Sequence, residues 1–213
     1  MSSASGVIAP ELRAEFPGLR LHWTALDAGV HRSPPELRRR LRELSDRYLG
    51  ASVVAMRTQP IPHAYRAFFR QVGLDPDAER IPSEEAAVRR LVQGRFEPRN
   101  TVQDATLIAL IETGVPVWAL DDRRVEVDSL GIRIAMAGDR LGSTPDGTAL
   151  PAGQVVVADR ECVHATLFSE PVPEHRPGPR TSRVVLFAVA VDGVPAIHVE
   201  EALWVSTDAI EAR

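Results

Sequence analysis

The spacing of apolar residues changes near Pro116, and this change limits the fold to a few classes. Before it, apolar side chains recur at helical intervals, as Leu37, Leu41 and Leu44 do. After it, short segments rich in β-branched residues predict strands at 117–120, 131–137, 154–158, 163–168 and 182–191. With a closing helix over 195–212, this order predicts an α+β fold in which helices pack on a mixed, mostly antiparallel sheet.

The first half of the chain is predicted to be mainly helical. Helices are expected at 10–16, 34–48, 64–72, 84–93 and 102–113, with strands at 19–25 and 51–59. Ser33 and Ser83 are expected as N-caps because a serine hydroxyl can accept a backbone N–H at a helix start. Gly94 and Gly114 are expected to end the helices that precede them.

Charge and length exclude several classes of protein. The 213 residues carry 25 basic and 29 acidic side chains, a net charge of −4, so no global positive field draws the chain to nucleic acid or to an anionic membrane. Every basic residue is arginine, which excludes a Schiff-base lysine. The longest apolar run, 184–191, is far shorter than the roughly 20 residues of a membrane helix. We therefore expect one cytoplasmic domain over 1–213 and no membrane partner.

The sequence contains no local catalytic signature, and its one cysteine excludes an internal disulfide. Cys162 and His164 would lie on one face of a strand, as a nucleophile and its base or as part of a metal site; ordinary core packing is the commoner role for such a pair. The other histidines, including His175, are scattered without metal-ligand spacing. No metal and no cofactor is expected. Asp104 interrupts an apolar helix, and an ionised group there needs a partner such as a backbone turn or an arginine.

Segments 100–108, 114–121, 131–138 and 155–159 follow one another in an order that resembles the editing and tRNA-binding module (third and fourth B segments) of the phenylalanyl-tRNA synthetase beta subunit. Further matches at 16–18, 65–76 and 80–86 resemble free-standing relatives of this module. The resemblance implies a β-sandwich core of the editing-module type. It also implies a protein that binds tRNA or an aminoacyl ester and that hydrolyses mischarged aminoacyl-tRNA in trans if it is catalytic.

Two polar positions of the resembling module are apolar in this chain. Leu107 stands at the position of an editing-pocket asparagine, and Trp118 stands at that of an editing histidine. The polar candidates that remain for the pocket are Thr106, Asp121 and Arg133, with surface or strand-end roles as the alternatives. Trp118 is expected either to fill the core or to form a pocket wall for an aromatic ring. The loop that precedes the last strand adds Arg180, Thr181 and Ser182 as further candidates.

Three functions stay open at this point. The first is binding of tRNA or aminoacyl-tRNA, with hydrolysis as its extension. The second is binding of a small, amino-acid-like molecule, which the net negative charge favours, and the third is an inactive interaction module. One basic face beside the pocket would indicate tRNA, whereas dispersed arginines would indicate a small ligand; the arginines concerned are Arg38, Arg39, Arg40, Arg42, Arg89, Arg90, Arg95 and Arg99.

Overall fold

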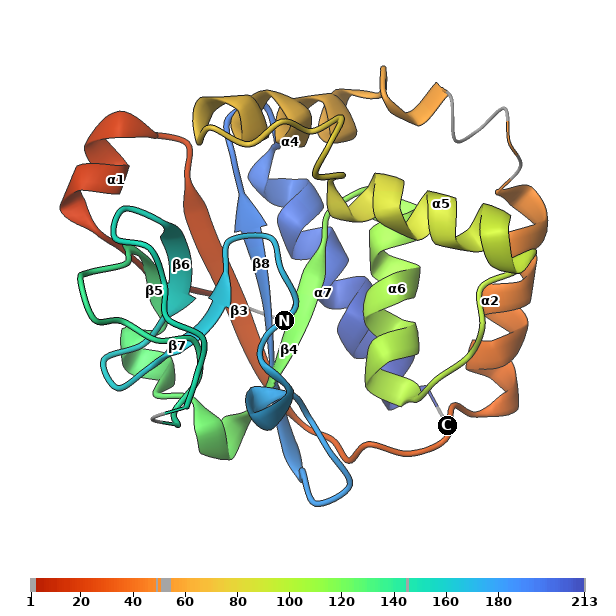
Figure 1. Cartoon of the computed structure of the whole chain (residues 1–213). Coiled ribbons are helices and arrows are strands. Elements are labelled where there is room, and N and C mark those ends of the chain that lie inside the picture. Colours follow the sequence, from red (N-terminus) through yellow and green to blue (C-terminus); the bar gives the residue numbers. More distant parts are fainter. Residues whose placement is uncertain (1–2, 49, 51–54, 145, 213) are drawn as a thin grey trace.

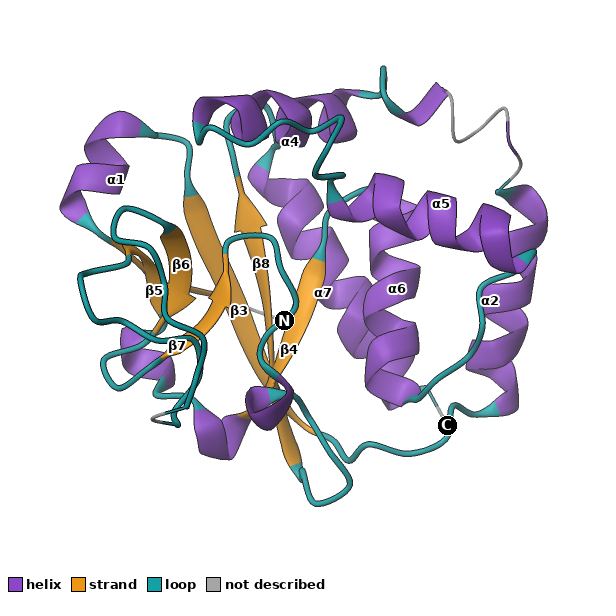
Figure 2. Cartoon of the chain, in the orientation of Figure 1, coloured by secondary structure: helices purple, strands orange, loops and turns teal. Residues whose placement is uncertain are grey.

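In the computed structural model, which describes residues 3–48, 50, 55–144 and 146–212, two four-stranded sheets pack together and helices cover one of them (Figures 1 and 2). The first sheet has the order β1 (Ala4–Ser5), β3 (Arg20–Asp27), β8 (Arg183–Ala190) and β4 (Val117–Asp121), and its neighbours are antiparallel. The second sheet has the order β2 (Val7–Ile8), β5 (Gly131–Ile134), β6 (Val155–Ala158) and β7 (Val163–Thr166). The β2–β5 pair is parallel, and the other pairs are antiparallel. The predicted α+β class with mostly antiparallel sheets is therefore confirmed.

The long strand β8 runs through the middle of the first sheet, between β3 and β4. All of its residues except Arg183 are buried, because α7 (Ala196–Glu211) covers one face of this sheet and the second sheet lies toward the other. A strand covered on both faces can be apolar at every position. This explains why the sequence shows a continuous apolar run from 184 to 191 instead of an alternating pattern.

The remaining helices lie mostly on the α7 side of the first sheet, except the first helix of the chain, which lies near the second sheet (Figure 1). They are α1 (Pro10–Glu15), α2 (Pro35–Arg47), α4 (Pro60–Gln71), α5 (Pro82–Gln93) and α6 (Thr101–Thr113), and the short 3-10 turns are η1 (Asp122–Arg124), η2 (Val127–Ser129) and η3 (Pro173–His175). Helix α6 contacts α2, α5, α7 and β4, so most of its circumference is buried. Asn100 caps its start by accepting a hydrogen bond from the Gln103 amide at 2.9 Å. Gly114 ends it with a φ of +75°, a conformation that glycine adopts without strain.

The structure differs from the sequence prediction in several places. Helix α4 begins at Pro60, four residues before the predicted start, and the short strands β1 and β2 were not predicted. Ser33 and Ser83 are not N-caps, because α2 and α5 begin at prolines and the residues before those prolines take the cap positions. The Ser33 hydroxyl instead donates to Asp104. Of the strand expected at 51–59, residues 51–54 lie outside the described residues, and the next residues form a helical turn in which the Thr58 amide donates to the Ala55 carbonyl.

Apolar side chains from both sheets join in one buried cluster. Leu21 and Phe187 of the first sheet belong to it, as do Ile132 and Val157 of the second. Among the described residues, no helix combines the length and the apolar character that a membrane crossing requires.

Candidate functional site

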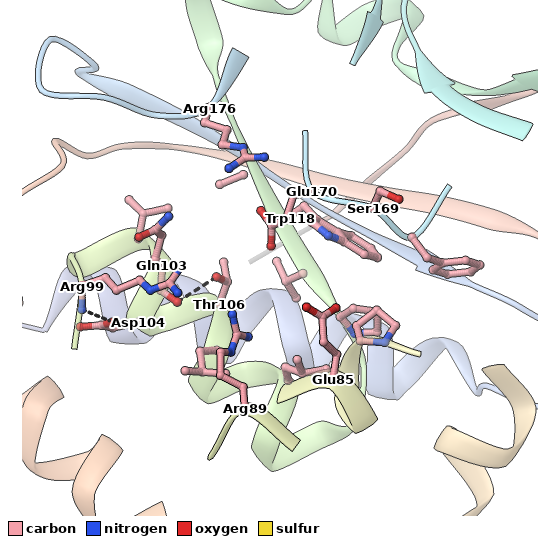
Figure 3. Close-up of a pocket in the computed structure, with 18 of the residues that line it drawn as sticks. Glu85, Arg89, Arg99, Gln103, Asp104, Thr106, Trp118, Ser169, Glu170 and Arg176 are labelled. Atoms are coloured by element: carbon pink, nitrogen blue, oxygen red, sulfur yellow. Dashed lines mark hydrogen bonds between the residues drawn. The ribbon is translucent and has the colours of Figure 1, made fainter. Parts of the chain in front are cut away.

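A pocket of about 410 Å³ opens between α5, α6, the start of β4 and the segment 167–177 (Figure 3). Its volume lies in the range of about 300 to 1,000 Å³ that is usual for small-ligand sites. The elements that form it come from three distant parts of the chain, so only the folded structure brings its residues together. The charged and polar side chains that line it include Arg80, Glu85, Arg89, Arg99, Gln103, Thr106, Ser169, Glu170 and Arg176.

Aromatic rings form one wall of the pocket. Trp118 lies on β4 and stacks on Phe187 of β8, with ring centroids 5.5 Å apart and an interplanar angle of 22°. Phe168 contacts the same indole at 6.1 Å and stacks on Phe69 at 5.2 Å. Trp118 is only 6% exposed but lines the pocket, so it is both a core residue and a pocket wall.

Phe168 holds an unusual backbone conformation at this wall. Its φ is +64°, and it is the one non-glycine residue with positive φ in the described part of the chain. A bulky side chain at positive φ clashes with the backbone, and such strain is often found at binding sites. The bend turns the chain directly after β7, and Ser169 and Glu170 follow at the pocket.

Unpaired charges surround the aromatic wall. Arg89 of α5, Arg99 before α6 and Arg176 after η3 point toward the same cavity as Thr106 and Trp118 (Figure 3). Among the described residues, no carboxylate lies within ion-pair distance of these three arginines, although Arg176 Nε donates a hydrogen bond to the Pro171 carbonyl. The same lining also holds Arg80 and five carboxylates, those of Glu79, Glu85, Glu97, Asp104 and Glu170. The pocket can thus bind a ligand that carries both an anionic and a cationic group.

Asp104 fixes the backbone of Arg99, one of these three arginines. Its carboxylate is 1% exposed and accepts hydrogen bonds from the Arg99 amide at 2.9 Å and from the Ser33 hydroxyl. Burial raises the pKa of Asp104, while the hydrogen bonds from Ser33 and Arg99 act in the opposite direction. The backbone-turn partner expected for this residue is therefore present, and it fixes the chain where Arg99 enters the pocket.

Three of the candidate residues from the sequence line the pocket: Thr106, Leu107 and Trp118. The Thr106 hydroxyl is half-buried and donates to the Gln103 carbonyl at 3.1 Å, which leaves its oxygen lone pairs available to a ligand. Leu107 contributes apolar surface beside it.

The other five candidates are not brought to the pocket. Asp121 ends β4, where it accepts hydrogen bonds from Thr181 at 2.7 Å and from the Arg123 guanidinium at 2.8 and 3.2 Å. Arg133 lies in the second sheet, where it pairs with Asp139. Arg180 and Ser182 are exposed in the loop before β8, outside the lining. Asp121, Thr181 and Arg133 thus have structural partners that account for their positions.

The arginines considered for tRNA binding do not form one free basic face. Arg39 pairs with Glu36 and Glu43, and Arg40 pairs with Glu112 at 2.6 Å. Arg90 donates to the Ser45 carbonyl, and Arg95 pairs with Glu97. Of the eight, Arg89 and Arg99 line the pocket. The eight arginines are therefore dispersed, and the two that line the pocket lie among carboxylates of the same lining.

Sequence reasoning missed Arg176, Ser169, Glu170 and the bend at Phe168. Their chain segment follows a strand and contains several prolines, which predicts a loop but not the direction in which it runs. Nothing in the local sequence shows that this loop closes over α6, some 60 residues earlier in the chain.

No family model matches this chain. Over 121 residues it is 34% identical to a protein named phenylalanine–tRNA ligase beta subunit from Gloeobacter violaceus, a match that covers 55% of this chain. The chain is distantly related to that subunit. It spans about 15% of the subunit's length. The match confirms the resemblance seen in the sequence at the level of the subunit.

Proposed function

We propose that the pocket binds the aminoacyl end of a charged tRNA. We also propose that the chain forms one domain of the editing-module type. The observation that carries this proposal is the lining itself: an aromatic wall at Trp118, three arginines without ion-pair partners among the described residues, and carboxylates that include Glu85 and Glu170. The distant relationship to a tRNA ligase subunit supports the choice of ligand.

The chemistry of an aminoacylated 3′ end matches this lining group by group. The free α-amino group is cationic and suits Glu85 or Glu170. The terminal phosphates are anionic and suit guanidinium donors such as Arg89 or Arg99. The adenine or an aromatic amino-acid side chain can stack against Trp118, because every base offers a flat π face.

Hydrolysis of the bound ester forms the second part of the proposal. Water would attack the ester carbonyl, releasing the amino acid and the free ribose hydroxyl of the tRNA. An ester that is already activated needs mainly a positioned water and donors for the oxyanion. The Thr106 oxygen, which still has free lone pairs, would accept a hydrogen bond from the water, and the side-chain NH2 of Gln103 would donate to the oxyanion.

The test is a panel of labelled aminoacyl-tRNAs, including tyrosine and phenylalanine on phenylalanine tRNA, measured for binding and for deacylation against the same tRNAs uncharged. We expect the charged forms to bind at least about tenfold more tightly than the uncharged forms, since the aminoacyl group fills the pocket. Arg99→Gln should weaken binding. Arg13→Gln, an exposed arginine on α1 far from α5 and α6, is the matched control and should not. Equal binding of charged and uncharged tRNA would contradict the proposal.

A second candidate function is binding of a free amino acid or a related metabolite. Ion pairing of the α2 arginines and the net charge of −4 favour it, because long tRNA contacts need free positive charge. Saturable binding of a free amino acid, with no binding of any charged tRNA, would select this candidate instead.

A further inference from the structure

Three side chains that are separate in the sequence meet beside β7, away from the pocket lining. They are Cys162, His164 and His175, and one potential metal-ligating atom from each lies within 4.8 Å of those of the other two. His164 is fully buried and His175 is 1% exposed. His175 is far from metal-ligand spacing in the sequence, but η3 places its ring next to that of His164.

Both imidazole rings are held by their outer nitrogens. His164 Nε2 is 3.0 Å from the Asp159 carboxylate, and His175 Nε2 contacts the Ser143 hydroxyl. The two Nδ1 atoms therefore face each other at 2.9 Å. Metal-ligating histidines in proteins typically bond a carboxylate or another oxygen through the ring nitrogen that does not bind the metal. The arrangement around these two rings has that form.

We infer that Cys162, His164 and His175 form a binding site for a late first-row divalent cation such as Zn²⁺. Tetrahedral ligation with bonds of about 2.0 to 2.3 Å needs ligand atoms about 3.3 to 3.7 Å apart. The two Nδ1 atoms, 2.9 Å apart, must separate by a few tenths of an ångström, and ligand atoms that lie up to 4.8 Å apart must approach by about 1 Å. Two imidazole nitrogens and a sulfur suit Zn²⁺ or its neighbours and not Mg²⁺ or Ca²⁺, which prefer oxygen.

The charges and protons of the site balance when the cation binds. Cys162 loses its S–H proton to solvent as the sulfur–metal bond forms. The proton between the two Nδ1 atoms moves to His175 Nε2, where the Ser143 oxygen accepts it. The Asp159 carboxylate is 2% exposed and accepts hydrogen bonds from three backbone amides, so it stays as a fixed negative charge. One thiolate and one carboxylate together neutralise a divalent cation, so they offset the desolvation cost of burying the metal.

The cation would join two segments of the chain, 162–164 and 172–175, and Ser143 of a third segment would hold the His175 ring. The 141–143 segment is already bonded to β7 through the Gly142 amide and the Val163 carbonyl at 2.8 Å. The 172–175 segment is bonded to β7 through the Val172 amide and the His164 carbonyl at 2.9 Å. Arg176 follows directly and lines the pocket. Metal binding should therefore stiffen the pocket wall that carries Arg176.

The test is titration of the full, metal-stripped chain with Co²⁺, followed by displacement with Zn²⁺. We expect one equivalent of Co²⁺ to give tetrahedral d–d absorption and a thiolate-to-cobalt charge-transfer band. Cys162→Ser should abolish that band, and His175→Gln should abolish stoichiometric binding. Ser143→Ala, an exposed position, should fold normally and weaken binding by about 10- to 100-fold.

His198→Gln is the matched control, because the His198 side chain is 41% exposed and, among the described residues, its ring nitrogens hydrogen-bond only to Glu201. It should bind Co²⁺ as the native chain does. Zn²⁺ should also raise the melting temperature of the native chain and of His198→Gln, and leave that of Cys162→Ser unchanged. The inference is overturned if the native chain shows no saturable cobalt spectrum, or if Cys162→Ser and Ser143→Ala bind Co²⁺ as the native chain does. Neither result depends on what the pocket binds.

Discussion

The negative charge of Asp121 is expected to stabilise the end of β4 and not to serve the pocket. Its side chain is 9% exposed, and the Arg123 guanidinium is the main cause that lowers its pKa from 3.8 to about 2, with Thr181 as a further donor. Because the folded-state pKa lies below the unfolded-state value, the stabilisation is complete above about pH 5 and is lost as the pH falls through 2.

The size of this effect follows from the two pKa values. The difference between 3.8 and about 2 corresponds to roughly 2 kcal/mol at pH 7 and to roughly half of that at pH 3. Arg123 is 57% exposed, so solvent screens the pair and we expect about 1 to 2 kcal/mol at pH 7.

Urea unfolding of Asp121→Asn beside the native chain, followed by circular dichroism at pH 7, 5 and 3, measures this contribution. The free energy of unfolding should be lower in the variant at pH 7, and the gap should narrow by about half at pH 3. A gap that is the same at every pH would refute the electrostatic reasoning. Weaker binding of a pocket ligand by a fully folded Asp121→Asn would refute the placement of this residue outside the pocket.

Three further changes test the packing that holds the pocket. The Arg66 and Glu84 side chains are 7% and 5% exposed, so Arg66→Met leaves the Glu84 carboxylate buried without its closest partner. This variant should lower the free energy of unfolding by about 3 to 5 kcal/mol. The double variant Arg66→Met/Glu84→Leu should be closer to the native chain in urea unfolding. Tyr65→Phe removes a buried 2.8 Å hydrogen bond to a β8 carbonyl and should cost about 1 to 2 kcal/mol by the same assay, and a neutral result would show that water satisfies that carbonyl. Gly131→Ala places a Cβ against the backbone oxygen of β2 and should lower the calorimetric melting temperature by several degrees, whereas an unchanged value would mean that the β2–β5 pair is not closely packed.

The helices could be predicted well from the sequence because their signals are local. The glycines at 94 and 114 end α5 and α6 in the left-handed conformation that the predicted caps require. The N-cap serines were predicted wrongly because proline at the first helical position fixes the start independently of a capping side chain. The Ser33 hydroxyl had a partner 71 residues away, which no local rule detects.

The strands of four or more residues could be located from the sequence, but the two-residue strands β1 and β2 and the partners of all strands could not. β8 pairs along its whole length with β3, and the two strands are separated by most of the chain. For the same reason Trp118 could be placed on a strand, while its stacking on Phe187 could not be foreseen. The contact of His175 with His164 depends on the path of a proline-rich loop, so spacing alone excluded a cluster that the fold creates.

The central claim is that an aminoacylated 3′ end binds against Trp118, and fluorescence of a chain with that tryptophan alone tests it most directly. Trp23→Phe and Trp204→Phe leave Trp118 as the single indole, and the ligand is an adenosine monophosphate analogue whose aminoacyl group is joined by an amide so that it cannot be hydrolysed. The account predicts a saturable change in Trp118 emission, weakened by Arg99→Gln and unaffected by Arg13→Gln. An emission spectrum that stays constant through the titration, in a chain shown to be folded, would contradict it.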